Sequence, residues 1–298
     1  MEKRPFGKTD LQVSVLGFGG AEIGFERASE DTVRRLLLSA LEEGLNVIDT
    51  AECYEQSEEL IGKAVSDRRS QYYLFTKCGH GASFDIRAWR ADEIKESIDR
   101  SLKRLKTDYL DLVQLHSCSE ETLRRGEAIE ALQKARQDGK TRYIGYSGDG
   151  QAARYAIETG AFDTLQTSVS IADQEALDLT LPLAQQTGLG VIAKRPIANA
   201  VWRHKTMPEN PYVQPYWQRL QKLAYDFIDG DIGKSVSIAL RFTLSVPGVH
   251  TAIVGTSKPG RWRENANLLS LGPLDTEQFE GIRARWRAVA QGNWVGEI

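Results

Sequence analysis

Residues 44–62 read GLNVIDTAECYEQSEELIG and contain, in order, a short strand-type run, a polar loop and the start of a helical pattern. The strand-type run ends at Asp49, and Ser57 directly precedes an apolar helical pattern, which predicts a capped helix start. Asp49 and Tyr54 therefore share one strand-to-helix loop. A carboxylate and a phenol at the end of a buried strand are typical of the edge of an active site.

Seven further strand-type runs occur along the chain, and all eight are separated by longer helical patterns. The eight predicted strands are 15–18, 46–49, 72–77, 110–116, 142–147, 164–169, 190–194 and 251–255. The predicted helices are 29–43, 57–66, 91–106, 120–138, 151–158, 175–187, 233–244 and 261–269, with another in the tail at 276–290. An eightfold strand–helix repeat predicts an α/β fold, the closed (β/α)8 TIM barrel.

A doubly wound open sheet is the alternative, because it also alternates strands and helices. Its dinucleotide fingerprint needs three spaced glycines after the first strand. Gly17-Phe-Gly19-Gly20-Ala-Glu lacks the third glycine, so this alternative is disfavoured.

Two segments lie outside the repeat. Residues 4–14 predict a β-hairpin with its turn at 7–10, suited to closing the bottom of the barrel. Residues 197–230 follow the seventh strand and contain three prolines together with Trp202, Tyr212, Tyr216 and Trp217. This composition predicts an ordered lid over a pocket, and the final GNWVGEI segment is placed to reach the same mouth.

Composition narrows the function classes. A length of 298 residues with 41% hydrophobic content fits one barrel domain spanning 1–298. A net charge of -3 gives no reason to expect a nucleic-acid partner. The three cysteines have no pairing motif, so neither a disulfide framework nor a metal site is expected. The absence of a signal peptide or an apolar span predicts a cytoplasmic protein without a membrane partner, acting on a small molecule.

Four polar residues at or just after strand ends form a candidate proton-transfer set, because strand ends meet at one face of such a barrel. They are Asp49, Tyr54, Lys77 and His116. An ammonium near a phenol lowers its pKa, a carboxylate holds that ammonium charged, and a histidine can hydrogen-bond a substrate carbonyl.

Each of the four also has an ordinary structural explanation. Asp49 could cap a turn, Tyr54 could pack, Lys77 could lie at the surface, and His116 could be a hydrogen-bonded core residue. Their joint placement at converging strand ends favours a shared function.

Several motifs resemble those of the aldo-keto reductase family. Besides GLNVIDTAECYEQSEELIG, they are Thr76-Lys77, 108–116 (DYLDLVQLH), 142–147 (RYIGYS) and 253–265 (IVGTSKPGRWREN). The resemblance implies that Asp49, Tyr54, Lys77 and His116 form a catalytic tetrad in which Tyr54 is the general acid of carbonyl reduction. It also implies hydride transfer from a nicotinamide.

The same resemblance suggests a set of cofactor contacts. Ser147 and Gln166 would hydrogen-bond the nicotinamide carboxamide, and residues 255–257 precede a helix whose start can receive a phosphate. Arg261 would hold a ribose 2′-phosphate, which favours NADP(H) and leaves NAD(H) possible. The full predicted set is Gly20, Ser147, Gln166, Lys194, Arg195, Gly255, Thr256, Ser257, Arg261, Glu264 and Asn265.

Three positions depart from the family pattern. Gly148 stands where asparagine is frequent, and Lys194-Arg195-Pro196 replaces an aromatic-serine pair whose aromatic stacks on the nicotinamide. Lys194 or Arg195 could instead stack on a ring or contact an anion. Gly255 stands where some members carry a lysine for the 2′-phosphate.

The resulting hypothesis is a monomeric NADP(H)-dependent reductase of an aldehyde or ketone. One alternative is a nicotinamide-binding regulatory subunit, like the channel subunits that share this fold. Another is a cofactor-free lyase or aldolase that uses Lys77 as a Schiff-base nucleophile.

Overall fold

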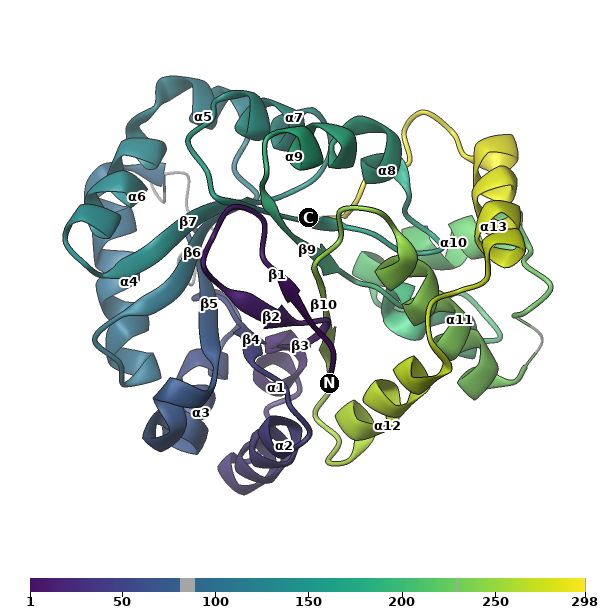
Figure 1. Cartoon of the computed structure of the whole chain (residues 1–298), viewed down its shortest axis with the longest axis horizontal. Helices are drawn as coiled ribbons and strands as arrows, with labels where there is room; N and C mark the ends of the chain where they lie inside the picture. Colours follow the sequence, from purple (N-terminus) through teal and green to yellow (C-terminus); the bar gives the residue numbers. More distant parts are fainter. Residues whose placement is uncertain (81–88, 229, 298) are drawn as a thin grey trace.

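The computed structural model describes residues 1–80, 89–228 and 230–297. Eight parallel strands close into a barrel in the order β10-β3-β4-β5-β6-β7-β8-β9 (Figure 1). The barrel strands are β3 (Leu16–Gly19), β4 (Val47–Asp49), β5 (Tyr73–Cys78), β6 (Leu110–His116), β7 (Thr141–Ser147), β8 (Thr164–Ser168), β9 (Gly190–Lys194) and β10 (Thr251–Gly255). The predicted (β/α)8 TIM barrel is confirmed, with each strand within two residues of its predicted bounds.

Helices surround the barrel on its outer face (Figure 1). They are α1 (Ala21–Phe25), α2 (Glu30–Glu42), α3 (Ser57–Val65), α4 (Ala91–Leu105), α5 (Glu120–Arg125), α6 (Glu127–Gln137), α7 (Gly150–Glu158), α8 (Glu175–Leu179), α9 (Leu181–Gln186), α10 (Gln214–Leu223), α11 (Ile232–Ser245), α12 (Arg261–Leu268) and α13 (Thr276–Val289). Short 3-10 turns are η1 (Ser66–Gln71), η3 (Ala198–Arg203), η4 (Pro211–Val213) and η5 (Leu269–Leu271).

Two predicted helices are each divided in the structure. The helix predicted at 120–138 breaks at Gly126, which adopts φ +79 and ends α5 before α6 begins. Glycine takes this left-handed conformation without a steric cost. The helix predicted at 175–187 breaks at Thr180, where Pro182 occupies the first turn of α9. Proline is compatible with a helix start but not with a helix interior, so a new helix begins there.

The N-terminal hairpin closes the bottom of the barrel, as the sequence predicts. Strand β1 (Lys3–Pro5) pairs antiparallel with β2 (Gln12–Ser14). The side chains of Phe6, Leu11 and Val13 pack on the inward-facing Val47, Phe75, Leu112 and Ile192 to form a small separate core. Gly7 in the turn has φ +56, and a side chain there would overlap the backbone of Gly190. The turn therefore requires glycine to sit this close to the barrel.

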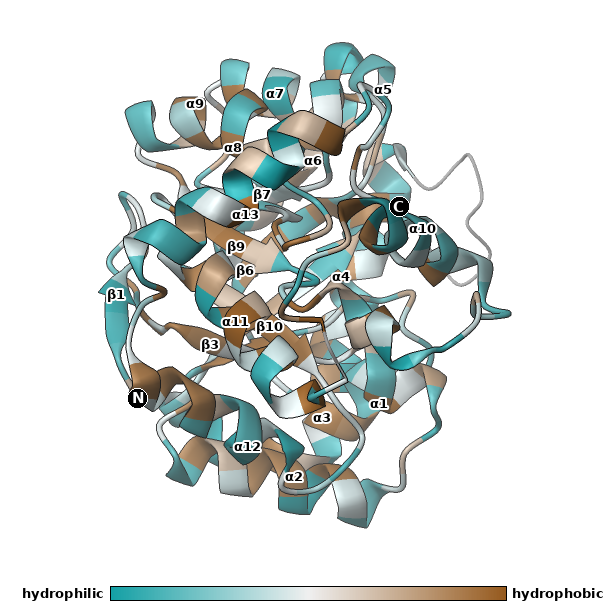
Figure 2. Ribbon diagram, turned by 90° about the vertical axis from the view of Figure 1, so that its right-hand side faces the viewer, coloured by the Kyte–Doolittle hydropathy of each residue, from teal (hydrophilic) through white to brown (hydrophobic). Residues whose placement is uncertain are grey.

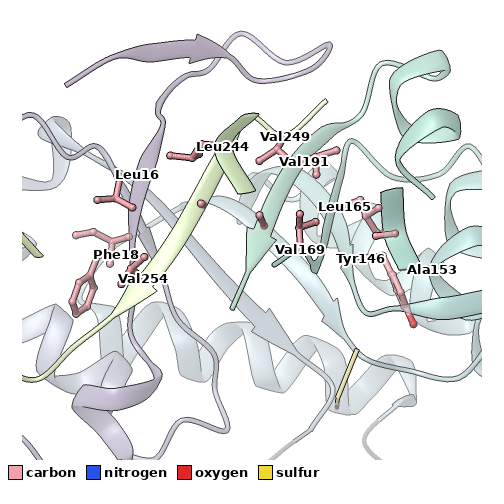
Figure 3. Close-up of a cluster of buried hydrophobic side chains, with 14 of the residues drawn as sticks. Leu16, Phe18, Tyr146, Ala153, Leu165, Val169, Val191, Leu244, Val249 and Val254 are labelled. Atoms are coloured by element: carbon pink, nitrogen blue, oxygen red, sulfur yellow. The ribbon is translucent and has the colours of Figure 1, made fainter. Parts of the chain in front are cut away.

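The larger core lies between the barrel and the helices. Apolar side chains on the outer face of the strands alternate with the inward-facing ones and pack under the helices. Figure 3 shows part of this layer, in which Leu16, Val191 and Val254 project from three neighbouring strands. The rigid barrel built in this way fixes the positions of the strand ends.

The hairpin and the C-terminal tail lie at opposite ends of the barrel. Figure 2 shows the N-terminus beside β1 on one side of the molecule and the C-terminus near α10 on the other. The segment after β9, which contains η3, η4 and α10, lies on the side of the tail, at the carboxyl ends of the strands. Within the described part of the chain, no helix has the length and apolar character needed to cross a lipid bilayer.

Candidate active site

A buried ion pair lies at the centre of the carboxyl-end face. Lys77 Nζ donates to Asp49 Oδ1 at 2.5 Å and to the Thr50 carbonyl oxygen at 2.8 Å. The side chains of Lys77 and Asp49 are each only 1% exposed. Gln166 and Gln114 donate to Asp49 Oδ2 at 2.9 and 3.5 Å. Burial raises the pKa of Asp49, while Lys77 and the two amides oppose that shift. Each charge is thus compensated inside the barrel, as a buried pair requires.

Tyr54 and His116 lie beside this pair. The two rings meet edge-on at a centroid distance of 5.7 Å, and Lys77 Nζ is 5.0 Å from the centre of the Tyr54 ring. His116 Nδ1 is also 3.4 Å from Cys53 Sγ. The structure therefore brings together all four residues of the predicted proton-transfer set, from the ends of β4, β5 and β6.

The protonation states differ from the expectation that Lys77 lowers the pKa of Tyr54. Burial, followed by the charge of Asp49, raises the pKa of Tyr54 well above its usual value. Burial, followed by the charge of Lys77, holds the pKa of His116 well below its usual value. Lys77 directs its charge to Asp49, so the phenol and the imidazole are both neutral near pH 7. Both can donate a hydrogen bond to the same oxygen atom.

The loop that carries Tyr54 is anchored by two buried carboxylates. Glu52, two residues before Tyr54, accepts from Ser97 Oγ and from Arg100 Nε of α4. Glu58, at the start of α3, accepts from Thr76 Oγ1 at 2.7 Å and pairs with Arg104 of α4 at 3.4 Å. Burial raises the pKa of Glu58.

Two more bonds fix the same loop. Ser57 Oγ donates to the Gly20 carbonyl oxygen at 2.7 Å, and the Gly20 N–H donates to the Asp49 carbonyl oxygen at 2.7 Å. Gly20, predicted as a cofactor contact, thus uses its backbone groups to hold β4 and the loop. Contacts before Tyr54 in the sequence, at Glu52, and after it, at Ser57 and Glu58, therefore fix the position of Tyr54.

A row of aromatic rings lines this part of the face. Phe25 contacts Tyr54, Tyr54 contacts His116, His116 contacts His80, and His80 contacts Trp89, with centroid distances of 5.6, 5.7, 5.4 and 5.1 Å. Phe25 is 54% exposed, although it is a large apolar side chain. The row therefore offers a surface on which the flat or apolar face of a ligand can pack.

Ser147 and Gln166 lie at adjacent strand ends, where the predicted carboxamide site would be. Ser147 Oγ donates to Gln166 Oε1 at 3.1 Å, and both side chains are 1% exposed. A hydroxyl and an amide can both donate and accept, so this pair fits a carboxamide group. The next residue, Gly148, has no side chain.

Lys194 and Arg195, at the end of β9, engage protein groups. Lys194 Nζ pairs with Asp149 Oδ2 at 2.8 Å, and burial lowers the pKa of Lys194 to about 8. Arg195 donates to Tyr212 OH at 2.6 Å, to Ser168 Oγ at 2.5 Å and to the Glu297 carbonyl oxygen at 2.5 Å. Arg195 thereby joins the barrel, the lid and the tail, and we call these contacts the Arg195 clasp.

The Arg195 clasp also affects the proton-transfer set electrostatically. Tyr212 and Arg195 both contribute to the electrostatic environment of Tyr54, and Lys194 and Arg195 contribute to that of His116. Tyr212 of the segment after β9 therefore lies near the site. The tail adds a further contact, because Arg219 of α10 donates to the Val295 carbonyl oxygen at 2.7 Å and pairs with Glu297 at 3.1 Å.

The predicted phosphate loop follows β10. Thr256 is buried, and its Oγ1 accepts from the Lys258 N–H at 3.1 Å. Arg261 at the start of α12 is half exposed and pairs with Glu264 at 3.2 Å, while Asn265 is 5% exposed. Ser257 Oγ donates to Glu26, which directly follows α1, and the Glu22 carboxylate lies against Gly255. The predicted residues are gathered in one place, together with two carboxylates that sequence reasoning did not include.

Sequence reasoning also missed Glu52, Glu58 and Asp149 as parts of the site. Glu58 follows the helix-start serine and has the form of an ordinary acidic residue of a first helical turn. Its burial is visible only when α4 packs against α3. Asp149 directly precedes α7, where an acidic residue is common, so its pairing with Lys194 carries no separate sequence signal.

Comparison with known proteins identifies relatives of the whole chain. The family model described as "Aldo/keto reductase family" matches residues 15–287. The chain is 32% identical to the L-galactose dehydrogenase of Arabidopsis thaliana, with 100% of this chain and 98% of that protein covered. It is 27% identical to the NADH-specific methylglyoxal reductase of Escherichia coli, with 93% and 96% covered. Its structure is similar to that of an aldo-keto reductase from Bacillus halodurans in its holo form, with a TM-score of 0.83, 30% identity, and 98% and 99% of the two chains covered.

Proposed function

The chain belongs to the aldo/keto reductase family, a family of oxidoreductases, and on this premise we propose that it reduces an aldehyde or ketone to an alcohol by hydride transfer. The observation that carries the proposal is the buried Lys77–Asp49 pair with neutral Tyr54 and His116 beside it. A carbonyl oxygen placed between the phenol and the imidazole would meet two hydrogen-bond donors on the protein. This is the arrangement that a developing alkoxide needs.

Each residue of the set has a distinct part in the proposed reaction. His116 hydrogen-bonds the substrate oxygen and orients it, and Tyr54 transfers its phenolic proton to that oxygen as charge develops. Lys77 limits the cost of the resulting phenolate because its ammonium lies over the Tyr54 ring. Asp49 keeps Lys77 charged and fixed. In the oxidation direction, Tyr54 accepts the proton instead.

The residues present fit a nicotinamide dinucleotide. Ser147 and Gln166 would hold the carboxamide, residues 255–257 and the start of α12 would hold phosphate and ribose groups, and Asn265 would face the adenine. The bound cofactor supplies or accepts the hydride. The sequence-based preference for NADP(H) depends on Arg261, and the name of the Escherichia coli relative keeps NAD(H) open.

A second candidate is the oxidation of a sugar at a hydroxyl group by the same residues run in reverse. The aromatic row from Phe25 to Trp89 supports it, because the apolar face of a sugar ring packs on aromatic side chains. The name of the Arabidopsis relative, L-galactose dehydrogenase, points to the same substrate class.

The sequence left two other functions open, a cofactor-free lyase or aldolase and a nicotinamide-binding regulatory subunit. Lys77 donates to two oxygen acceptors, which favours the charged ammonium over the neutral amine that Schiff-base chemistry needs. A regulatory subunit would retain this geometry and bind cofactor tightly without turnover.

Steady-state turnover of a panel of aldehydes and ketones with NADPH and NADH, and of sugars with NADP⁺ and NAD⁺, tests the proposal. Tyr54→Phe should lower turnover roughly 100-fold or more while cofactor binding persists. The control is Tyr155→Phe on α7, which keeps wild-type turnover. Turnover of Tyr54→Phe within a few fold of wild type would overturn the mechanism. Tight binding without turnover of any compound would favour the regulatory subunit.

A further inference from the structure

Two carboxylates, Glu22 of α1 and Glu26 directly after this helix, lie against the loop that would receive the adenosine ribose. Gly255 pairs with Gly19 in the barrel, so the end of β10 lies beside the start of α1. A Cβ atom on Gly255 would overlap the Glu22 carboxylate, which therefore fills the space where a side chain at this position would lie. Two residues on, Ser257 Oγ donates a hydrogen bond to the carboxylate of Glu26.

The cations of this region do not cancel these charges. Arg261 is already paired with Glu264 at 3.2 Å, and its side chain is 49% exposed. Lys258 is exposed and has no ion-pair partner among the described residues. The pKa of Glu22 is raised, first by burial, and the nearby charge of Glu26 raises it further. Two carboxyl groups are thus close together where residues 255–257 meet residues 22–26.

A ribose 2′-phosphate and a ribose 2′-hydroxyl interact in opposite ways with nearby carboxylates. The phosphate carries nearly two negative charges, which adjacent carboxylates repel. The hydroxyl is a hydrogen-bond donor, and a carboxylate is its common partner in NAD-binding proteins. Some family members carry a lysine at the position of Gly255. Here the residue is glycine, and the Glu22 carboxylate occupies the space that a side chain would need.

We propose that Glu22 and Glu26 make this chain select NAD(H) over NADP(H). The inference rests on the proposed function, and it supersedes the sequence-based preference for NADP(H), which counted Arg261 without the carboxylates opposite it. Glu26 is exposed and directly bonded to Ser257, so it is the residue whose charge can be removed with the least effect on folding.

Isothermal titration of the purified chain tests the inference without turnover. The probes are NADH and NADPH, together with 5′-AMP and 2′,5′-ADP; each pair differs only by the 2′-phosphate. We expect the wild type to bind NADH at least about tenfold more tightly than NADPH, and 5′-AMP more tightly than 2′,5′-ADP. Higher ionic strength should narrow both gaps, because it screens the repulsion.

The variants assign this preference to the two residues. Glu26→Gln, alone and with Glu22→Gln, should narrow the NADH-to-NADPH affinity ratio by about tenfold, chiefly by tightening NADPH. Glu277→Gln on α13 removes one charge far from the loop and should leave the ratio at its wild-type value. Combining Glu22→Ala with Gly255→Lys should shift the preference further toward NADPH, because the lysine then has both room and a phosphate partner.

Two results would overturn the proposal. One is a wild type that binds NADPH and 2′,5′-ADP more tightly than NADH and 5′-AMP. The other is a ratio that Glu26→Gln and the double variant leave unchanged. If the folded wild type bound neither dinucleotide, the proposed function itself would fail, and this result is distinct from a reversed preference.

Discussion

Gln166 donates its amide, at 2.9 Å, to the Asp49 carboxylate oxygen that Lys77 leaves free. Ser147 in turn donates to the Gln166 carbonyl oxygen, so one hydrogen-bonded row crosses the barrel from β7 to β5. The residues predicted to hold the nicotinamide are thereby bonded to the residues predicted to move the proton. A change at one group is expected to alter the other.

Replacing Gln166 with leucine tests this coupling. The variant keeps a similar side-chain volume but removes a donor to a buried carboxylate, which costs about 1–3 kcal/mol in general. We expect about a tenfold weaker cofactor affinity together with about a tenfold lower kcat. Titration and steady-state kinetics measure both, and Gln137→Leu on the exposed end of α6 is the control. Loss of affinity with an unchanged kcat would show that the two groups act separately.

The anchoring of the Tyr54 loop can be tested at two neighbouring glutamates. Glu58 is 1% exposed and bonded to Thr76 and Arg104, whereas the adjacent Glu59 is 53% exposed. Glu58→Gln leaves Arg104 without its buried charge partner and should lower kcat several fold through displacement of Tyr54, with KM for the cofactor little changed. It should also lower the free energy of unfolding by about 1–3 kcal/mol. Glu59→Gln should change neither quantity, and equal effects of the two variants would refute the anchoring role.

The Arg195 clasp can be weakened at its lid contact. Tyr212→Phe removes the hydroxyl that accepts from Arg195 Nε but keeps the ring beside the guanidinium. We expect KM for the substrate to rise several fold while kcat stays near the wild-type value, because burial and Asp49 affect Tyr54 more strongly than Tyr212 does. Limited proteolysis within residues 204–213 should become faster. Unchanged proteolysis and KM would mean that this bond does not hold the lid.

At the closed end of the barrel, His250 Nδ1 accepts from the Val191 N–H at 3.0 Å. Burial, followed by the charge of Arg4, lowers the pKa of His250 below its usual value. The pKa of His250 in the folded state lies below its unfolded value of about 6.5. The contribution of neutral His250 to folding stability is therefore complete above that pH. It is lost as the pH falls through the folded-state pKa.

Urea unfolding between pH 8 and pH 5 measures this dependence. His250→Asn can present a non-titrating oxygen to the same N–H group, so its stability should decline less on acidification than that of the wild type. His204→Asn, in the exposed part of the lid segment, should follow the wild-type curve. Parallel curves for His250→Asn and the wild type would rule out His250 as the source.

The fold could be predicted from the sequence because each strand is a short buried run between helical patterns, and the eightfold repeat permits few architectures. Helix breaks were harder to place, since Gly126 and Pro182 are tolerated in or near helices and only the packing decides where the chain turns. Asp49, Tyr54, Lys77 and His116 could be placed together because strand ends of a barrel converge. Their roles, and those of the predicted cofactor contacts, stay predictions.

The remaining parts of the site depend on contacts between distant segments. Arg195 and Glu297 are about a hundred positions apart in sequence, and neither residue type nor spacing indicates that they meet. The same holds for Glu26 and Ser257, which come together only because the first and last barrel strands are neighbours. Pairings of this kind follow from closure of the barrel, so a linear pattern cannot reveal them.

The hairpin and the tail place the two ends of the chain at opposite ends of the barrel, and this has a practical consequence. A tag, label or surface tether joined to Met1 would project from the closed end and leave the mouth accessible. The same addition after the last residue would begin beside Glu297, whose carbonyl oxygen is bound by Arg195. Attachment at the N-terminus is therefore the geometry in which an immobilised protein should keep the behaviour of the free one.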